Sequence, residues 1–220
     1  MTQSAANTAV QTRTAWMANR ESLEPLRAAG TVVHFAEGRE IFAEGDASEV
    51  FFKVISGVVR ICKFLNDGRR QIEAFHVEGD VFGFELGPAY MLSAEAVSDC
   101  TLVSYRRRGV ESLAQKDQTV TRQLFQYAMQ GLARAQEHSL LLGRRGAAEK
   151  VASFLLGWAS AGQRVVILAM TRQDIADYLG LTIETVSRTL SQFERDGIIA
   201  LPNVRQIQIE NIEALEDLAD

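Results

Sequence analysis

The chain lacks most of the features that mark secreted, membrane and metal-binding proteins. It has only two cysteines, Cys62 and Cys100, which are too few for a disulfide framework or a four-cysteine metal site. No stretch approaches the roughly 18 consecutive apolar residues that a membrane-spanning helix needs. Arg13 and Arg20 interrupt the N-terminal region, which does not resemble a signal peptide. These absences predict a cytoplasmic protein that meets no membrane.

Positive charge is also scarce. The 220 residues include 23 Lys and Arg against 28 Asp and Glu, for a net charge of −5. This is not the basic balance that by itself suggests a nucleic-acid partner. If the chain binds DNA, it must rely on a few well-placed arginines and on backbone N–H groups at helix N-termini. The 47% of hydrophobic residues predicts a packed core rather than disorder.

The first part of the chain has the texture of a β-domain. Residues 1–22 are polar and rich in alanine, and we expect a loose N-terminal arm there. Over 23–108, short β-branched and aromatic runs alternate with glycines at positions 45, 57, 68 and 79. Evenly spaced turns between short strands are typical of a sandwich, jelly roll or barrel.

The pattern becomes helical after residue 108, and we expect a long helix within residues 109–143. Apolar residues recur there at steps of three and four, which places them on one stripe of a helix. The residues predicted for this stripe are Val120, Leu124, Ala128, Leu132, Ala135 and Leu142. Two interpretations remain open: the stripe packs on its own domain, or it pairs with the same helix of a second subunit. We favour the second, a homodimer.

Residues 144–220 are predicted to form a separate domain that contains a helix-turn-helix. The run Gly143–Gly146 breaks the long helix and is a candidate hinge, before a helix over 147–159 and a strand over 165–168. Thr171, with Asp174 three residues on, can form a capping box that begins a first helix. Gly180 can take the left-handed conformation that ends this helix, and Thr182 can cap a second one.

Burial alone does not explain the outward face of the second helix. A helix-turn-helix places the start of its second helix in the DNA major groove. There an arginine suits guanine, and a carboxylate can accept from the amino group of cytosine or adenine. The alternative is a solvated Glu184–Arg188 pair one turn apart. The residues predicted to contact DNA are Thr171, Arg172, Thr182, Glu184, Thr185, Ser187 and Arg188.

Two further apolar runs follow this helix. Residues 197–199 and 206–209 flank Pro202 and Asn203 and are predicted to form a β-hairpin. The C-terminal domain is therefore expected to be a winged helix-turn-helix, and the chain as a whole an α+β protein.

This order of elements resembles the CRP/FNR superfamily of bacterial regulators over nearly the whole chain. Gly45-Asp46, the run Val58–Ile61 and the run Gly79–Gly83 match landmarks of the family's β-roll, a jelly roll like that of cyclic-nucleotide-binding domains. The run Leu181–Arg188 resembles the FNR-type recognition helix, Glu-x-x-Ser-Arg. The resemblance implies a homodimeric activator that reads TTGA-N6-TCAA sites in double-stranded DNA and contacts RNA polymerase.

The sequence departs from other members of this family at the residues that would bind a signalling ligand or cofactor. Cyclic-nucleotide binders place an Arg-Ser pair in the β-roll, but Leu92 stands where the arginine would be. Iron–sulfur members need four cysteines, and residues 1–61 contain none. Haem-type sensing has only His34, His76 and His138 to draw on. The chain is most similar to the FixK-type members, which lack both devices, so we expect no cofactor.

Two other functions compete with this interpretation. A jelly-roll enzyme needs clustered metal ligands, and three scattered histidines without a His-x-His pair supply none. A regulator of the same fold that responds to a small ligand in the β-roll, or to oxidation of Cys62 or Cys100, is the second rival. Cysteines on strands are usually inert packing residues, so the redox function is the weaker prediction.

Overall fold

The computed structural model describes residues 29–144, 146–159 and 164–219, and the predicted N-terminal arm lies outside them. Among the described residues, those up to His138 form one compact unit and those from Ser139 form a second. The division falls inside the long helix rather than after it, where the sequence had placed the domain boundary. No helix in the described parts of the chain is long and apolar enough to cross a membrane.

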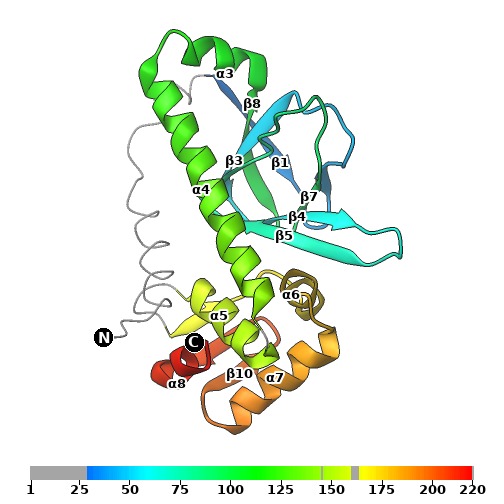
Figure 1. The fold of residues 1–220 in the computed structure, drawn as a ribbon, viewed down its shortest axis with the longest axis vertical. Helices are drawn as coiled ribbons and strands as arrows, with labels where there is room; N and C mark the ends of the chain where they lie inside the picture. The colour runs from blue at the N-terminus through cyan, green and yellow to red at the C-terminus, as the bar shows by residue number, and fades with distance from the viewer. Residues whose placement is uncertain (1–28, 145, 160–163, 220) are drawn as a thin grey trace. The chain divides into compact units, whose positions relative to one another are not determined.

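The first unit is a jelly roll of eight antiparallel strands (Figure 1). The strands are β1 Gly30–Phe35, β2 Glu40–Phe42, β3 Val50–Ser56, β4 Val59–Phe64, β5 Arg70–His76, β6 Val81–Phe82, β7 Ser93–Ala96 and β8 Cys100–Arg106. They pair as β1 with β8, β2 with β7, β3 with β6 and β4 with β5, in two four-stranded sheets. The predicted β-roll is confirmed.

Glycines make the tight turns that the sequence indicated. Gly57 joins β3 to β4 with a φ of 92°, and Gly68 joins β4 to β5 with a φ of 85°. At Gly57 space is limiting as well, because a Cβ there would lie 2.4 Å from the backbone oxygen of Asp99. Only glycine combines this left-handed conformation with so close an approach.

Aromatic side chains fill the space between the two sheets. The rings of Phe42 and Tyr90 stack with centroids 3.7 Å apart, and Phe52 and Phe82 stack at 5.4 Å. The Tyr90 hydroxyl donates to the backbone oxygen of Val50 at 2.6 Å, so this buried polar group is satisfied. The partly buried Leu92 packs against the same cluster.

Two helices follow the β-roll where the sequence indicated one continuous segment. Helix α3 covers Arg107–Ala114 and α4 covers Gln118–Gly143. The break lies at Asp117, whose carboxylate accepts a hydrogen bond from the backbone N–H of Thr119 at 2.8 Å. Because a side chain that satisfies an orphan N–H favours a helix start, Asp117 begins a new helix rather than continuing the old one.

The apolar residues expected on one stripe of α4 divide between two faces. Val120 is fully buried in a small cluster with Phe51 and Tyr105, and Leu124 packs against this cluster. Val120 is therefore wrong as a subunit contact, because its own β-roll covers it. A second face lies roughly 100° around the helix, one residue step away. This exposed stripe consists of Phe125, Ala128, Met129, Leu132 and Ala135.

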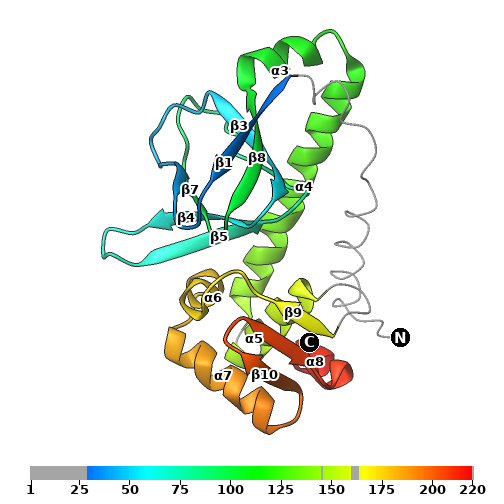
Figure 2. The ribbon, with the colours of Figure 1, turned by 180° about the vertical axis from the view of Figure 1, so that it is seen from behind.

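The described residues of the second unit include four helices after α4, which pack on one another, and a three-stranded sheet (Figures 1 and 2). Its elements are α5 Ala147–Trp158, β9 Val165–Ile167, α6 Arg172–Leu179, α7 Ile183–Arg195, β10 Ile199–Asn203, β11 Gln206–Ile209 and α8 Ile212–Ala219. The sheet order is β10-β11-β9. The predicted helix-turn-helix and hairpin are confirmed, although the hairpin turns at Val204 and Arg205 rather than at Pro202 and Asn203.

Candidate nucleic-acid interface

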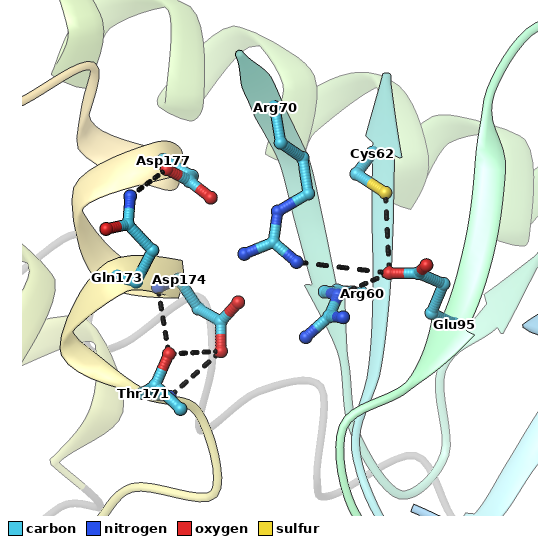
Figure 3. A network of polar contacts seen from close by, with 8 residues as sticks. All are labelled: Arg60, Cys62, Arg70, Glu95, Thr171, Gln173, Asp174 and Asp177. Atoms are coloured by element: carbon cyan, nitrogen blue, oxygen red, sulfur yellow. Dashed lines mark hydrogen bonds and ion pairs between the residues drawn. The ribbon is translucent and has the colours of Figure 1, made fainter. Parts of the chain in front are cut away.

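Helix α6 begins at a complete capping box (Figure 3). The Thr171 side chain accepts from the backbone N–H of Asp174, and an Asp174 carboxylate oxygen accepts from the backbone N–H of Thr171 at 2.9 Å. The same oxygen accepts from the Thr171 hydroxyl at 2.8 Å. Asp174 is 3% exposed, so the box satisfies a buried carboxylate as well as orphan N–H groups.

The turn between the two helices depends on Gly180. Its φ of 62° is left-handed, and its backbone N–H bonds to the oxygen of Ala176 to close α6. The Lys150 ammonium donates to the oxygen of Leu179 at 3.2 Å and places a cation at the negative end of the helix. Leu142 lies beside this turn, 3.5 Å from where a Cβ on Gly180 would be.

The second helix, α7, is capped by Thr182. Its hydroxyl accepts from the backbone N–H of Thr185 at 3.2 Å and lies 3.0 Å from the Thr185 hydroxyl. Val186, Leu190 and Phe193 face the core of the unit and are 0–2% exposed. This inward face fixes the rotation of the helix, and with it the direction of the side chains on the other face.

The outward face carries a carboxylate and a guanidinium one turn apart. Glu184 and Arg188 are both exposed, whereas Ser187 is half-buried. Hydrogen bonds from the Glu184 backbone N–H and the Thr182 hydroxyl, with a smaller effect of the Arg188 charge, hold the pKa of the Glu184 carboxyl below its ordinary value. The helix therefore presents an ionised acceptor and a five-donor cation side by side.

The predicted contact residues thus take two kinds of position. The hydroxyls of Thr171 and Thr182 are engaged in capping, and Thr185 contributes its N–H and hydroxyl to the same cap. Arg172 is half-buried in the first turn of α6. A further basic residue, Arg205, lies at the exposed tip of the β10–β11 hairpin and was not among the predicted contacts. The signal was a basic residue beside the predicted turn.

The two cysteine side chains of the β-roll, Cys62 and Cys100, are buried. The Cys62 thiol lies 3.8 Å from an oxygen of Glu95, which also pairs with Arg60 at 2.7 Å (Figure 3). Burial and the nearby Glu95 charge raise the pKa of Cys62 to about 11, and burial raises that of Cys100. Among the described residues, no three His, Cys, Asp or Glu side chains group as metal ligands.

Comparisons with known proteins agree with this architecture. A family model described as a cyclic nucleotide-binding domain matches residues 32–117. A second model, described as a Crp-like helix-turn-helix domain, matches residues 149–218. The two matches cover the β-roll unit and the helix-turn-helix unit.

Relatives of similar length are transcription regulators. The chain is 48% identical over 208 residues to the nitrogen fixation regulation protein FixK of Azorhizobium caulinodans, covering 90% of this chain and 84% of that protein. Identity to FixK of Rhizobium meliloti is 42% over 198 residues, covering 89% and 90%. The structure of FixK2 from Bradyrhizobium japonicum aligns with a TM-score of 0.81 at 44% identity, covering 87% of this chain and 98% of that one. The chain therefore belongs to the CRP/FNR superfamily as a FixK-type, DNA-binding transcription regulator, a family of non-enzymes.

Proposed function

We propose that the protein acts as a homodimeric activator that reads TTGA-N6-TCAA sites without cAMP or an iron–sulfur cluster and contacts RNA polymerase. The observation that carries this proposal is the outward face of α7, where Glu184 and Arg188 are exposed one turn apart. The RNA polymerase contact rests on the family resemblance alone.

The chemistry of this face favours base readout over general phosphate binding. A carboxylate near DNA is an electrostatic cost unless it accepts a hydrogen bond from a base amino group. Arg188 can reach guanine O6 and N7 with two parallel N–H donors. Glu184, Ser187 and Arg188 together match what the resemblance implies for a TTGA half-site, with Arg188 on the guanine pair.

The exposed stripe of α4 supports the homodimer. Phe125 is 64% exposed and Leu132 is 51% exposed, on a helix whose inward face is already covered by the β-roll. Ala128 and Ala135 are small enough to let a second helix approach closely. A palindromic site requires two recognition helices related by two-fold symmetry, which a helix pair of this kind supplies.

The interior of the β-roll supports independence from cyclic nucleotides. Leu92, in the position where relatives that bind cyclic nucleotides carry an arginine, packs against the aromatic cluster between the sheets. An aliphatic side chain there offers no bidentate partner for a cyclic phosphate.

A binding-site selection tests the proposal. The full-length protein is incubated with random duplex DNA at about physiological salt, in parallel with and without cAMP, and the bound sequences are read out. We expect TTGA-N6-TCAA to be enriched equally in both arms. Enrichment of unrelated sequences would refute the predicted site, and enrichment only with cAMP would refute ligand independence.

A further inference from the structure

A single arginine on α4 reaches two residues of the β-roll at once. Arg134 donates through Nη2 to a carboxylate oxygen of Asp80 at 2.8 Å and through Nη1 to Nδ1 of His76 at 3.1 Å. His76 ends β5, and Asp80 lies in the turn before β6. The guanidinium is planar and its donors have a fixed geometry, so two acceptors on one rigid domain define its orientation closely.

Both acceptors are themselves held in place. The other carboxylate oxygen of Asp80 accepts from the backbone N–H of Val77 at 2.9 Å. The His76 ring is buried and stacks on Phe82, a member of the aromatic cluster, with centroids 5.3 Å apart. Because an arginine only donates, His76 Nδ1 must offer a lone pair, so the ring is neutral with its proton on Nε2.

The positive charge of Arg134 acts on three acidic residues. Asp80 pairs with it directly, and its charge also acts on Glu73 of β5 and on Glu137 of α4. Burial raises the pKa of both glutamates, and the Arg134 charge opposes that rise. Loss of the guanidinium would leave the mostly buried Asp80 without its ion-pair partner and would remove the positive charge that acts on Glu73 and Glu137, which weakens the contact of the helix with the strands.

The position of Arg134 along α4 links this contact to the rotation of the helix. The apolar contacts of the helix with the β-roll involve Val120, Leu124 and Tyr127, in its first turns. Arg134 continues the same face two turns further on, at the same height along the helix axis as Leu132 and Ala135 of the exposed stripe but on a different side of the helix. A rotation of the helix by one residue, roughly 100°, would turn the stripe away from a partner and would break both Arg134 bonds.

We propose that Arg134 is a positioning residue that fixes the rotation of α4 on the β-roll, so that the exposed stripe is presented for dimerisation without any ligand. This inference rests on the homodimer of the proposed function. The ion pair and the His76 contact hold α4 in this rotation without a bound ligand, which agrees with a protein for which we propose no cyclic-nucleotide signal.

The test compares Arg134→Ala with Arg108→Ala, which removes the same charge from an exposed position on α3. Sedimentation equilibrium gives the dimer dissociation constant, and titration with a TTGA-N6-TCAA duplex gives the DNA affinity. We expect Arg134→Ala to weaken dimerisation about tenfold and DNA binding with it, within the range typical of coupling between sites. Arg108→Ala should dimerise as the parent does. A parent-like dimer for Arg134→Ala would overturn the proposal.

A cross-linked dimer separates positioning from a merely structural effect. Ala128→Cys introduces a thiol on the exposed stripe, while Cys62 and Cys100 are buried and do not compete. Failure of the parent carrying Ala128→Cys to cross-link would refute the dimer interface itself, and not only the role of Arg134. Once oxidised, Arg134→Ala with Ala128→Cys should bind DNA as the cross-linked parent does, and a persistent defect would overturn the positioning role.

Two milder variants keep the inference testable if Arg134→Ala does not fold by circular dichroism. Arg134→Lys retains the charge near Asp80 but cannot donate to both acceptors. Asp80→Asn removes the ion pair and retains a side chain of the same shape. Both should weaken the dimer by less than Arg134→Ala would, and parent-like dimerisation of both would overturn the proposal.

Discussion

At the scale of single residues, α7 separates two tasks that its sequence interleaves. Thr182 and Thr185 form the cap that starts the helix, whereas the side chains of Glu184 and Arg188 are exposed on its outward face. The hydroxyls were predicted as DNA contacts, and their capping bonds explain these residue types without DNA. In the proposed function, specificity therefore rests on few side chains, in a protein whose net charge of −5 offers little general attraction to phosphates.

Arg188 is the residue whose loss should change specificity most. Arg188→Ala removes the two donors proposed for guanine, so we expect a loss of about 1–3 kcal/mol of discrimination at that base pair. Arg188→Lys should recover part of the affinity but little of the discrimination, since an ammonium cannot make the bidentate contact. Arg195→Ala, at the far end of the same helix, is the control for lost charge. Equal discrimination by Arg188→Ala and the parent would refute the assignment.

Cys62 should be unreactive in the folded protein. Its pKa of about 11, raised by burial and by Glu95, leaves almost no thiolate at neutral pH, and the thiolate is the reactive form. We expect mass spectrometry to find neither Cys62 nor Cys100 labelled by iodoacetamide under native conditions, and both labelled in guanidinium. Rapid native labelling of either thiol would revive the redox alternative.

At the scale of elements, the sequence predicts best what is decided locally. The capping box at Thr171, the left-handed Gly180 and the turn at Gly57 each depend on residues within a few positions, and all three are confirmed. The contact of Arg134 with His76 and Asp80 joins positions 58 and 54 residues apart, which periodicity cannot reveal. For the same reason, the periodicity predicted a single apolar stripe on α4 where the structure has two apolar faces. Only the fold shows which of the two faces the β-roll covers.

The exposed face of α4 can be tested by adding a charge. Leu132→Glu places a carboxylate in the centre of the stripe, where two copies would bring like charges together in a desolvated contact. We expect a monomer at micromolar concentration and at least tenfold weaker DNA binding, with an unchanged circular dichroism spectrum because Leu132 is half exposed. Gln126→Glu adds the same charge to the exposed surface away from the stripe and should leave the dimer intact. A dimeric Leu132→Glu would place the subunit contact elsewhere.

At the scale of the whole molecule, the buried His76 beside Asp80 and Arg134 makes the free energy of unfolding depend on pH. Burial, opposed by the Asp80 charge and assisted by that of Arg134, lowers the pKa of His76 to about 4. In the unfolded chain the ring takes up a proton near pH 6.5, so as the pH falls from 6.5 to 4 the unfolded state binds more protons than the folded one. This group alone should lower the free energy of unfolding by about 2–3 kcal/mol across that window and have no effect above pH 7.

Glu73 and Glu137 have raised pKa values and act in the opposite direction, so the contribution of His76 must be measured by comparing variants. His76→Gln retains an oxygen that can accept from Arg134 but cannot titrate. Urea unfolding at a series of pH values should show that the free energy of unfolding falls less steeply with decreasing pH for His76→Gln than for the parent. Equal slopes for the two proteins would refute the role of His76 in the pH dependence.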